Sequence, residues 1–321
     1  MKGKNAALLT LTAAAALTAI GYVETRYVAG HRETRDPIMH DSPDLPPKVA
    51  EVRRAIRAAR RKQEKLPWRR VSIRSADGLI LSGSFLPYPD KAAVRGTVLF
   101  AHGYRSSQND FALALETYRS RGFHILMIDQ RAHGKSEGSY IGFGALERGD
   151  VVLWAHFINE YLHVRLPIFL AGLSMGATTV LMASELTLPK NVCGIIADCG
   201  FTSCGEIVRK VMRDRKLPVA LMYPLFRPAC RLFAGFDPDG YSTTDAVGHC
   251  RVPVLFIHGM DDDFVPCTMT VRAYFACRSE KDLLLVPGAR HGYAYAVDPE
   301  GYEAALDRFL EKCLRGDAAR R

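Results

Sequence analysis

The feature that most constrains the fold is a regular alternation of short apolar runs with helical stretches over residues 96–314. Runs of six or seven residues bounded by turn residues are typical of parallel strands covered by helices on both faces. The predicted strands are Gly96–Ala101, Phe123–Ile128, Leu166–Gly172, Val192–Ala197, Val252–Ile257 and Lys281–Val286, and the predicted helices include Asp110–Arg121, Leu146–Tyr161, Ala177–Leu186 and Pro299–Leu314. The sequence therefore predicts a doubly wound, mostly parallel α/β sheet.

An antiparallel hairpin is expected just before this alternation. The dipeptide Asp77-Gly78, a strong hairpin signal, separates Val71–Arg74 from Leu79–Gly83. The hairpin should open the sheet on its amino-terminal side.

Composition and charge exclude several classes of protein. The chain has 321 residues, of which 48% are hydrophobic and 24% charged, which argues against wholesale disorder and against a multi-pass membrane bundle. The formal net charge is +9, but residues 48–70 hold ten Lys/Arg against two Glu, which leaves about +1 for all other residues. No base-reading module accompanies this basic segment, so we expect no nucleic-acid partner.

The eight cysteines have no C-x-x-C spacing, so no zinc site is predicted. Several of them, including Cys193, Cys199 and Cys277, lie inside apolar runs. Free thiols in such places behave as small hydrophobic groups, so we expect buried thiols, with one or two disulfides as the alternative.

The amino terminus carries an uncharged run of 18 residues, Ala6–Val23, close to the length of a membrane-spanning helix. Its A-x-A matches fall mid-run instead of at its end, whereas Tyr22, Arg26 and Tyr27 at its end suit a membrane interface. We therefore expect residues 1–30 to form an uncleaved single-pass anchor in the cell membrane, on a side that the flanking charges leave unresolved. The alternative is a cleaved signal peptide and a secreted protein.

Residues 31–67 are expected to form a linker and a basic amphipathic helix. Four prolines mark the linker, and Val49, Val52, Ile56 and Ala59 recur at helical spacing among the basic residues. The narrow apolar stripe can pack on the next domain, or the basic face can attract anionic lipid headgroups.

A candidate nucleophile lies at the end of a predicted strand. The pentapeptide Gly172-Leu173-Ser174-Met175-Gly176 follows one apolar run and precedes a helix, which is the context of a nucleophile elbow. Glycines flank such a serine because its backbone is strained and crowded.

A serine hydroxyl needs a base and a carboxylate that orients the base. Asp261, Asp262 and Asp263 follow the predicted strand Val252–Ile257, and His291 follows the strand Lys281–Val286. The residues alone leave the choice among the three aspartates open. His102 and His258 precede glycines in turns and are expected to organise backbone hydrogen bonds.

The ordered landmarks resemble a serine hydrolase of the α/β-hydrolase superfamily, in particular its bacterial, often membrane-anchored, esterase or serine-aminopeptidase-like branch. Over residues 69–314 they are His102-Gly103-Tyr104, Asp129-Gln130-Arg131-Ala132-His133-Gly134-Lys135-Ser136, Gly172–Gly176, His258–Pro266 and Gly288–Gly292. The expected fold is accordingly an α/β-hydrolase fold with an antiparallel amino-terminal hairpin.

This resemblance also implies roles for individual residues. Ser174 would be the nucleophile, His291 the base and Asp262 the acid, because the family pattern H-G-x-x-D-x-x-V-P selects the middle aspartate. The amides of Tyr104 and Met175 would form the oxyanion hole. No cofactor and no metal ion are expected. His-Gly-Tyr departs from the H-G-G-G of many lipases, which weakens an assignment to bulky tertiary-alcohol esters.

The hydrolase domain is expected over residues 68–316. Between the predicted strands that end at Ala197 and begin at Val252 the chain inserts about fifty residues, more than one α/β loop requires, so a small helical cap is expected at about 202–250. The cap carries Leu217, Leu221, Met222, Tyr223, Leu225, Phe226, Leu232 and Phe233. These side chains either pack the cap on the core or line an apolar substrate pocket.

The expected function is hydrolysis of a carboxylic ester or related acyl bond in a small-molecule substrate, through an acyl-enzyme intermediate. Two alternatives stand beside it: a serine peptidase that acts on small peptides with the same triad, and a binding scaffold without turnover. The sequence does not predict an oligomeric state.

Overall fold

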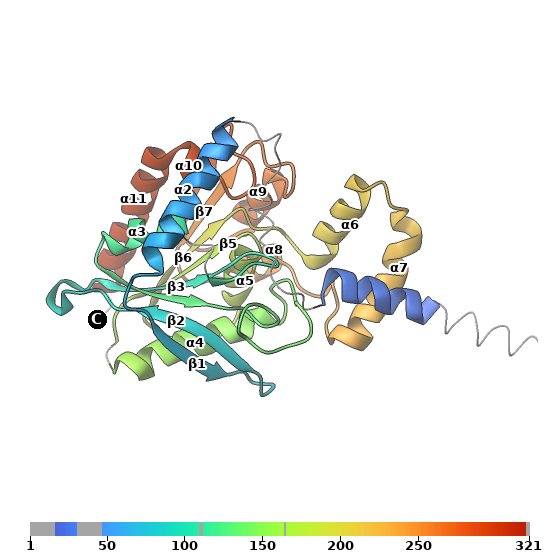
Figure 1. Cartoon of the computed structure of the whole chain (residues 1–321), viewed down its shortest axis with the longest axis horizontal. Coiled ribbons are helices and arrows are strands. Elements are labelled where there is room, and N and C mark those ends of the chain that lie inside the picture. Colours follow the sequence, from blue (N-terminus) through green and yellow to red (C-terminus); the bar gives the residue numbers. More distant parts are fainter. Residues whose placement is uncertain (1–16, 31–46, 109–111, 164, 319–321) are drawn as a thin grey trace, which may run out of the picture.

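A single eight-stranded sheet forms the centre of the molecule (Figure 1). The computed structural model describes residues 17–30, 47–108, 112–163 and 165–318. The strands are β1 (Arg69–Arg74), β2 (Ile80–Leu86), β3 (Gly96–Ala101), β4 (Phe123–Ile128), β5 (Ile168–Leu173), β6 (Val192–Asp198), β7 (Val254–Gly259) and β8 (Lys281–Val286). They lie in the order β1-β2-β4-β3-β5-β6-β7-β8.

The pairing confirms the predicted fold class. β1 and β2 are antiparallel to each other, and β2 is antiparallel to β4, whereas all pairs from β4 to β8 are parallel. Every residue of β3, β4, β6 and β7 is buried, as expected for strands with helices on both faces. The exposed edge strand β1 alternates between exposed and half-buried residues instead.

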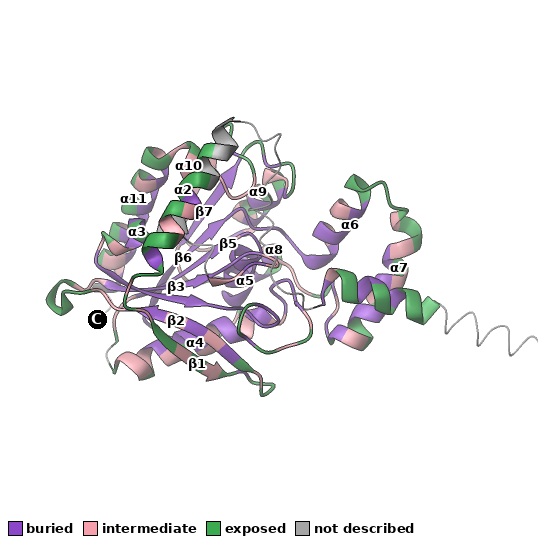
Figure 2. Cartoon of the chain, in the orientation of Figure 1, coloured by how far each residue is buried: buried purple, intermediate pink, exposed green. Residues whose placement is uncertain are grey.

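Helices cover both faces of the sheet (Figure 2). One apolar core lies under α4 (Glu147–Leu162), α5 (Met175–Ala183), α8 (Thr243–Val247) and α9 (Cys267–Ala276). The other lies under α3 (Ala112–Arg119), α10 (Ala294–Val297) and α11 (Pro299–Ala318), with α2 (Pro47–Gln63) packed beside α3. The short 3₁₀ helix η1 (Lys91–Ala93) precedes β3.

A third apolar cluster joins the sheet to the helices between β6 and β7. This segment holds α6 (Cys204–Asp214), α7 (Val219–Ala229) and the π-helix η3 (Cys230–Ala234), and α6 and α7 project to one side of the sheet in Figure 1. Their inward residues, among them Phe226, pack with Phe143 and Phe201. Leu221 and Leu232 point to solvent instead, with exposed fractions of 65% and 70%.

The expected membrane anchor is wrong. Residues 6–16 of the apolar run lie outside the described residues, but residues 17–28 form a helix, which we call the N-terminal helix. It packs against α7: a Cβ placed on Gly21 would lie 2.8 Å from the Ala229 Cβ and from the Leu225 carbonyl oxygen. Within the described part of the chain, no helix combines the length and the apolar character needed to cross a bilayer.

The basic segment does form the predicted helix, α2. Ile56 of its apolar stripe is buried, and Trp68 Nε1 donates to the Gln63 carbonyl oxygen at 2.8 Å, tying the end of α2 to the start of the sheet. The linker residues 31–46 lie outside the described residues. The eight cysteines are free thiols and seven of them are buried, which confirms the preferred alternative.

Helix α5 approaches β3 so closely that position 176 has room only for glycine. A Cβ there would overlap the carbonyl oxygens of Ala101 and His102. We expect Gly176→Ala to destabilise the protein by about 1–3 kcal/mol, the usual cost of overpacking, and to lower the Tm by several degrees. Gly149→Ala is the matched control, because the same Cβ on α4 meets nothing within 4 Å. An unchanged or higher Tm is expected for this control, since alanine favours helix. Equal Tm values for the two variants would contradict the crowding.

Candidate active site

The candidate nucleophile occupies a strained turn between a strand and a helix. Ser174 follows β5 and precedes α5, with φ 55° and ψ −116°. A Cβ on Gly172 would overlap the backbone of Gly176, so the chain turns back on itself within five residues. This turn holds the Ser174 side chain at the carboxyl edge of the sheet, where a doubly wound fold places its ligand crevice.

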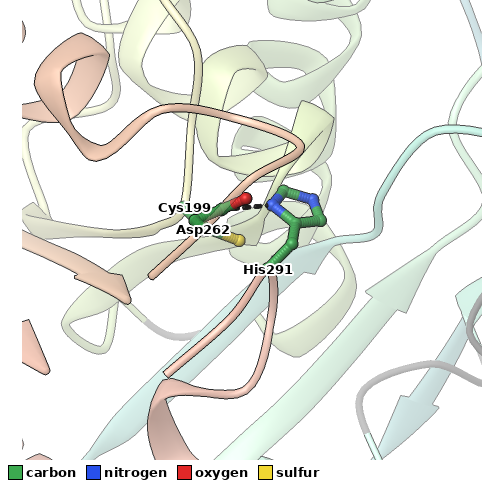
Figure 3. Close-up of side chains that lie close together, drawn as sticks. All are labelled: Cys199, Asp262 and His291. Carbon is green, nitrogen blue, oxygen red and sulfur yellow. Dashed lines mark hydrogen bonds and ion pairs between the residues drawn. The ribbon is translucent and has the colours of Figure 1, made fainter. Parts of the chain in front are cut away.

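Two hydrogen bonds link Ser174 to a histidine and an aspartate from later strands. His291, in the turn after β8, has Nε2 at 2.9 Å from the Ser174 Oγ. Its Nδ1 lies 2.6 Å from the Asp262 Oδ2, in the turn after β7 (Figure 3). A carboxylate only accepts, so Nδ1 carries the proton and Nε2 is free to accept the hydroxyl proton.

Asp262 is held as a carboxylate. Its Oδ1 accepts from the amides of Phe264 at 2.9 Å and Val265 at 2.8 Å. Burial pushes the pKa of Asp262 up, but the hydrogen bonds from His258 and His291 and from the Val265 amide outweigh it, so the pKa lies well below its ordinary value. The group is therefore ionised throughout the neutral range.

The other two aspartates of the run point elsewhere. Asp261 and Asp263 are exposed, and Asp263 pairs with Arg290 at the surface. Of the three, only Asp262 is buried and reaches His291.

His258 contributes more than the backbone hydrogen bonds that the sequence predicts for it. Its Nε2 lies 3.0 Å from the Asp262 Oδ2 and 2.9 Å from the Val265 carbonyl oxygen, and its Nδ1 lies 2.7 Å from the Thr270 Oγ1. Two acceptors face Nε2, so this nitrogen carries a proton. His258 therefore helps to fix the Asp262 carboxylate through Oδ2, the same oxygen that His291 bonds. An H-G dipeptide at a strand end carries no sign of this role, because the partner comes from the turn four residues later.

Of the two expected oxyanion donors, Met175 follows the serine directly and Tyr104 follows a glycine that lies beside the serine. Met175 is the first residue of α5, so its amide N–H has no acceptor inside the helix. The turn after β3 brings Gly103 beside the nucleophile, because a Cβ on Gly103 would lie 3.5 Å from the Ser174 Cβ. Tyr104, the next residue, stacks on Phe143 with ring centroids 5.2 Å apart.

Buried histidines organise that turn, as the sequence predicts for His102. The Gln130 amide donates to His102 Nε2 at 3.1 Å, and His102 Nδ1 lies 2.7 Å from the Gly103 carbonyl oxygen. Burial lowers the pKa of His102 to about 4, so it is neutral at pH 7. The Arg105 amide donates to His133 Nε2 at 3.0 Å, which links this turn to the loop after β4.

The loop after β4 is braced by a buried ion pair. Arg131 donates to both Asp150 oxygens, at 2.7 and 2.8 Å, and to Asp77 at 2.9 Å. These bonds tie the loop to α4 and to the β1–β2 hairpin. Arg131 thus has a structural partner on each side.

Cys199 lies close enough to His291 and Asp262 that the three could hold a metal ion, with donor atoms within 4.8 Å of one another (Figure 3). The chemistry of these three side chains does not favour metal binding. Burial, and after it the charges of Asp198 and Asp262, raise the pKa of the Cys199 thiol well above its ordinary value, and a thiol must ionise to bind metal. The other two donors already bind each other.

A second buried carboxylate, absent from the sequence analysis, lies beneath the site. Asp198 ends β6, and its Oδ1 has no hydrogen-bond partner in the described part of the chain. Burial raises the pKa of Asp198 to about 6, against the opposing attraction of His258 and His291 and a hydrogen bond with Tyr302.

Comparisons with known proteins agree with this architecture. Residues 92–232 match the family model described as "Serine aminopeptidase, S33". The uncharacterised protein YqkD of Bacillus subtilis is 26% identical over 216 residues, which cover 67% of this chain and 71% of that protein.

Solved structures share the fold. An esterase of Pyrococcus furiosus superposes with a TM-score of 0.64 at 24% identity, covering 78% of this chain and 93% of its own. The acylaminoacyl peptidase of Pyrococcus horikoshii gives a TM-score of 0.55 at 15% identity and covers 78% of this chain but 42% of its own.

The sheet order and the antiparallel hairpin are those of the α/β-hydrolase fold, which the two Pyrococcus structures share. The match to the serine aminopeptidase model and the likeness to an esterase and a peptidase support a hydrolase activity for this chain.

The raised pKa of Asp198 gives a pH-dependent stability. Its folded pKa of about 6 exceeds an unfolded value of about 3.9, so stability from this group is present at low pH and is lost as pH rises between these values. Asp198→Asn cannot ionise. We therefore expect the Tm difference, variant minus wild type, to increase from about pH 4 to about pH 7. A difference that stays constant across this range in thermal melts would contradict the assignment.

Proposed function

We propose that the protein is a serine hydrolase that cleaves a carboxylic ester or related acyl bond. The observation that carries this proposal is the unbroken pair of hydrogen bonds from Ser174 through His291 to Asp262. A neutral imidazole with a free Nε2 beside a serine hydroxyl, and an ionised carboxylate behind it, is the arrangement that makes serine nucleophilic.

The reaction follows from these atoms. As the Ser174 Oγ attacks the acyl carbon, its proton passes to His291 Nε2, and the negative charge of Asp262 stabilises the resulting imidazolium. The amides of Met175 and Tyr104 donate to the oxyanion of the tetrahedral intermediate. His291 then protonates the leaving alcohol, and the acyl group stays on Ser174. A water molecule, activated by the same nitrogen, releases the acid and restores the serine.

An ester is the preferred substrate class over a peptide. The third apolar cluster contains Met175, the residue after the serine, together with Phe143, Phe201 and Phe226, and such an apolar neighbourhood suits an apolar acyl or alcohol group. The similar Pyrococcus esterase is matched over nearly its whole length. The peptidase alternative is favoured by the family description and by the acylaminoacyl peptidase fold match. A binding scaffold without turnover is disfavoured, since it would not need these hydrogen bonds.

The nucleophile is tested by covalent labelling. A fluorophosphonate probe should label the wild-type protein, and Ser174→Ala should abolish labelling because the Ser174 hydroxyl is the one that lies in hydrogen-bond contact with His291 Nε2 among the described residues. Mass spectrometry of the labelled peptide identifies the site, and circular dichroism checks that the variant is folded. Labelling that persists in the folded variant would refute the assignment.

The acid is tested by a pair of substitutions in the same turn. Asp262→Asn removes the carboxylate that fixes the His291 tautomer, so kcat on a p-nitrophenyl ester should fall by orders of magnitude, on the order of 10⁴ in another triad. Asp261→Asn is the matched control, because Asp261 is exposed, whereas the carboxylate that bonds His291 belongs to Asp262. A loss from Asp261→Asn as large as that from Asp262→Asn would show that the wrong aspartate has been chosen.

A further inference from the structure

A cavity of about 570 Å³ lies between α2 and the antiparallel end of the sheet, where β1, β2 and β4 are neighbours. Small-molecule sites in proteins have volumes of about 300–1,000 Å³, so this cavity is large enough to hold a ligand. Among the described residues that line it, none is Ser174, Asp262 or His291. The candidate active site therefore does not account for this cavity.

The strand register puts the floor of the cavity on one face of the sheet. Arg70 of β1 pairs with Ser84 of β2, and Ser84 pairs with Met127 of β4, so the three lining residues form a row across the strands. Side chains alternate between the two faces along a strand, so Arg69 points to the face opposite Arg70. Met127 belongs to the apolar core under α3 and α11, and α2 packs beside α3 on that same face.

The wall that faces this floor comes from α2 and from the residues after it. Arg60 lies on α2, and Leu66 and Trp68 follow the end of that helix. The indole of Trp68 is held in place, because its Nε1 donates to the Gln63 carbonyl oxygen at 2.8 Å. Leu66 and Trp68 on the wall and Met127 on the floor give the cavity an apolar part.

Two loops at the carboxyl edge of the sheet complete the cavity, and one buried aspartate holds both. Of the lining residues, Gln108 follows β3 and Lys135 follows β4. Asp129, which is 1% exposed, accepts from the Gln108 amide at 2.9 Å and from the Lys135 amide at 3.0 Å. The backbone of this rim is therefore fixed before a ligand binds.

Three cationic side chains line the cavity: Arg60 from α2, Arg70 from β1 and Lys135 from the loop after β4. We call them the cavity cations. Glu64 is the one carboxylate among the described lining residues, so positive charge is in excess. Neither Arg70 nor Lys135 has an ion-pair partner in the described part of the chain. Like charges on the walls of a concave surface focus their potential into it, so the cavity attracts an anion.

We propose that this cavity binds a small organic anion, with a phosphate or carboxylate group at the cavity cations and an apolar part beside Trp68. Guanidinium groups present paired N–H donors that match two oxygens of a phosphate or a carboxylate. Anionic lipid headgroups carry the same chemistry. A free molecule fits better than a headgroup in a bilayer, because the cavity cations surround a concave space instead of covering a flat surface.

Tryptophan fluorescence reports binding at this cavity. The chain has two tryptophans: Trp68 lines the cavity, and Trp154 is fully buried in the core under α4. Hexyl phosphate should change the emission in a saturable way, and the change should vanish in Trp68→Phe, which keeps Trp154. Inorganic phosphate should bind more weakly, because it leaves the apolar part unfilled, and hexanol should give no saturable change. No response to hexyl phosphate, an equal response to hexanol, or a response that persists in Trp68→Phe would overturn the proposal.

Charge variants test the cavity cations. Arg70→Gln should raise the Kd for hexyl phosphate, and Arg70→Gln combined with Lys135→Gln should raise it by roughly tenfold or more, as expected for lost hydrogen bonds to a charged group. Arg69→Gln is the matched control, because it removes the same charge from the next residue of β1, on the opposite face of the sheet. This control should keep the wild-type Kd, and circular dichroism checks that all variants are folded. Equal Kd values for the wild type and the double variant would refute the site.

Two further titrations separate this site from the active site and from a membrane surface. Ser174→Ala should bind hexyl phosphate with the wild-type Kd, so the test stands whether or not the proposed function is correct. Weaker binding by Ser174→Ala would place the ligand in the active site instead. Vesicles of phosphatidylglycerol should change the Trp68 emission less than hexyl phosphate does at the same concentration of phosphate groups. A response to the vesicles without a response to hexyl phosphate would assign the cavity cations to a lipid surface and contradict the proposal.

Discussion

The close approach of α5 to β3 and β5 is the constraint on which the rest of the site depends. It forces the backbone of Ser174 to φ 55° and leaves no room for side chains at positions 172 and 176. The same approach puts the Met175 amide at a helix start and the turn of Gly103 against the serine. Strain at one residue is tolerated because the surrounding sheet is buried on both faces, and it fixes the position of the Ser174 side chain at the carboxyl edge of the sheet.

The two buried carboxylates near the site, Asp262 and Asp198, differ in the hydrogen-bond donors around them. Asp262 receives two amides and two imidazoles, so it stays ionised although it is buried. Asp198, the residue before Cys199, has fewer hydrogen-bond donors around it, and burial raises its pKa to about 6. The difference between the two carboxylates is therefore set by the number of hydrogen-bond donors that the turns after β6 and β7 provide, and not by depth alone.

Much of the fold was predictable because its signals are local. Apolar runs such as Phe123–Ile128 coincide with buried strands, and Asp77-Gly78 marks the hairpin. The candidate triad was also predictable, because Ser174 and His291 each follow a strand in a recognisable turn. No sequence pattern predicts that Asp198 and Cys199 lie at the site, because their positions depend on contacts between turns far apart in sequence. The bond from His258 to Asp262 depends on the shape of the turn after β7. Which of three adjacent aspartates is buried likewise depends on the turn geometry around Phe264 and Val265.

The amino terminus shows why hydropathy alone misleads. The run Ala6–Val23 reads as a spanning helix, yet its described end packs on α7 through Gly21, a residue whose missing side chain permits the contact. The hydropathy window stops just before Glu24 and Thr25, which continue the same buried face. Such a face is costly against lipid, because nothing in a hydrocarbon environment can donate to a carboxylate. Contacts with the protein hold the helix instead: Gly21 lies against α7, and the Val28 carbonyl oxygen accepts a hydrogen bond from the Tyr104 hydroxyl.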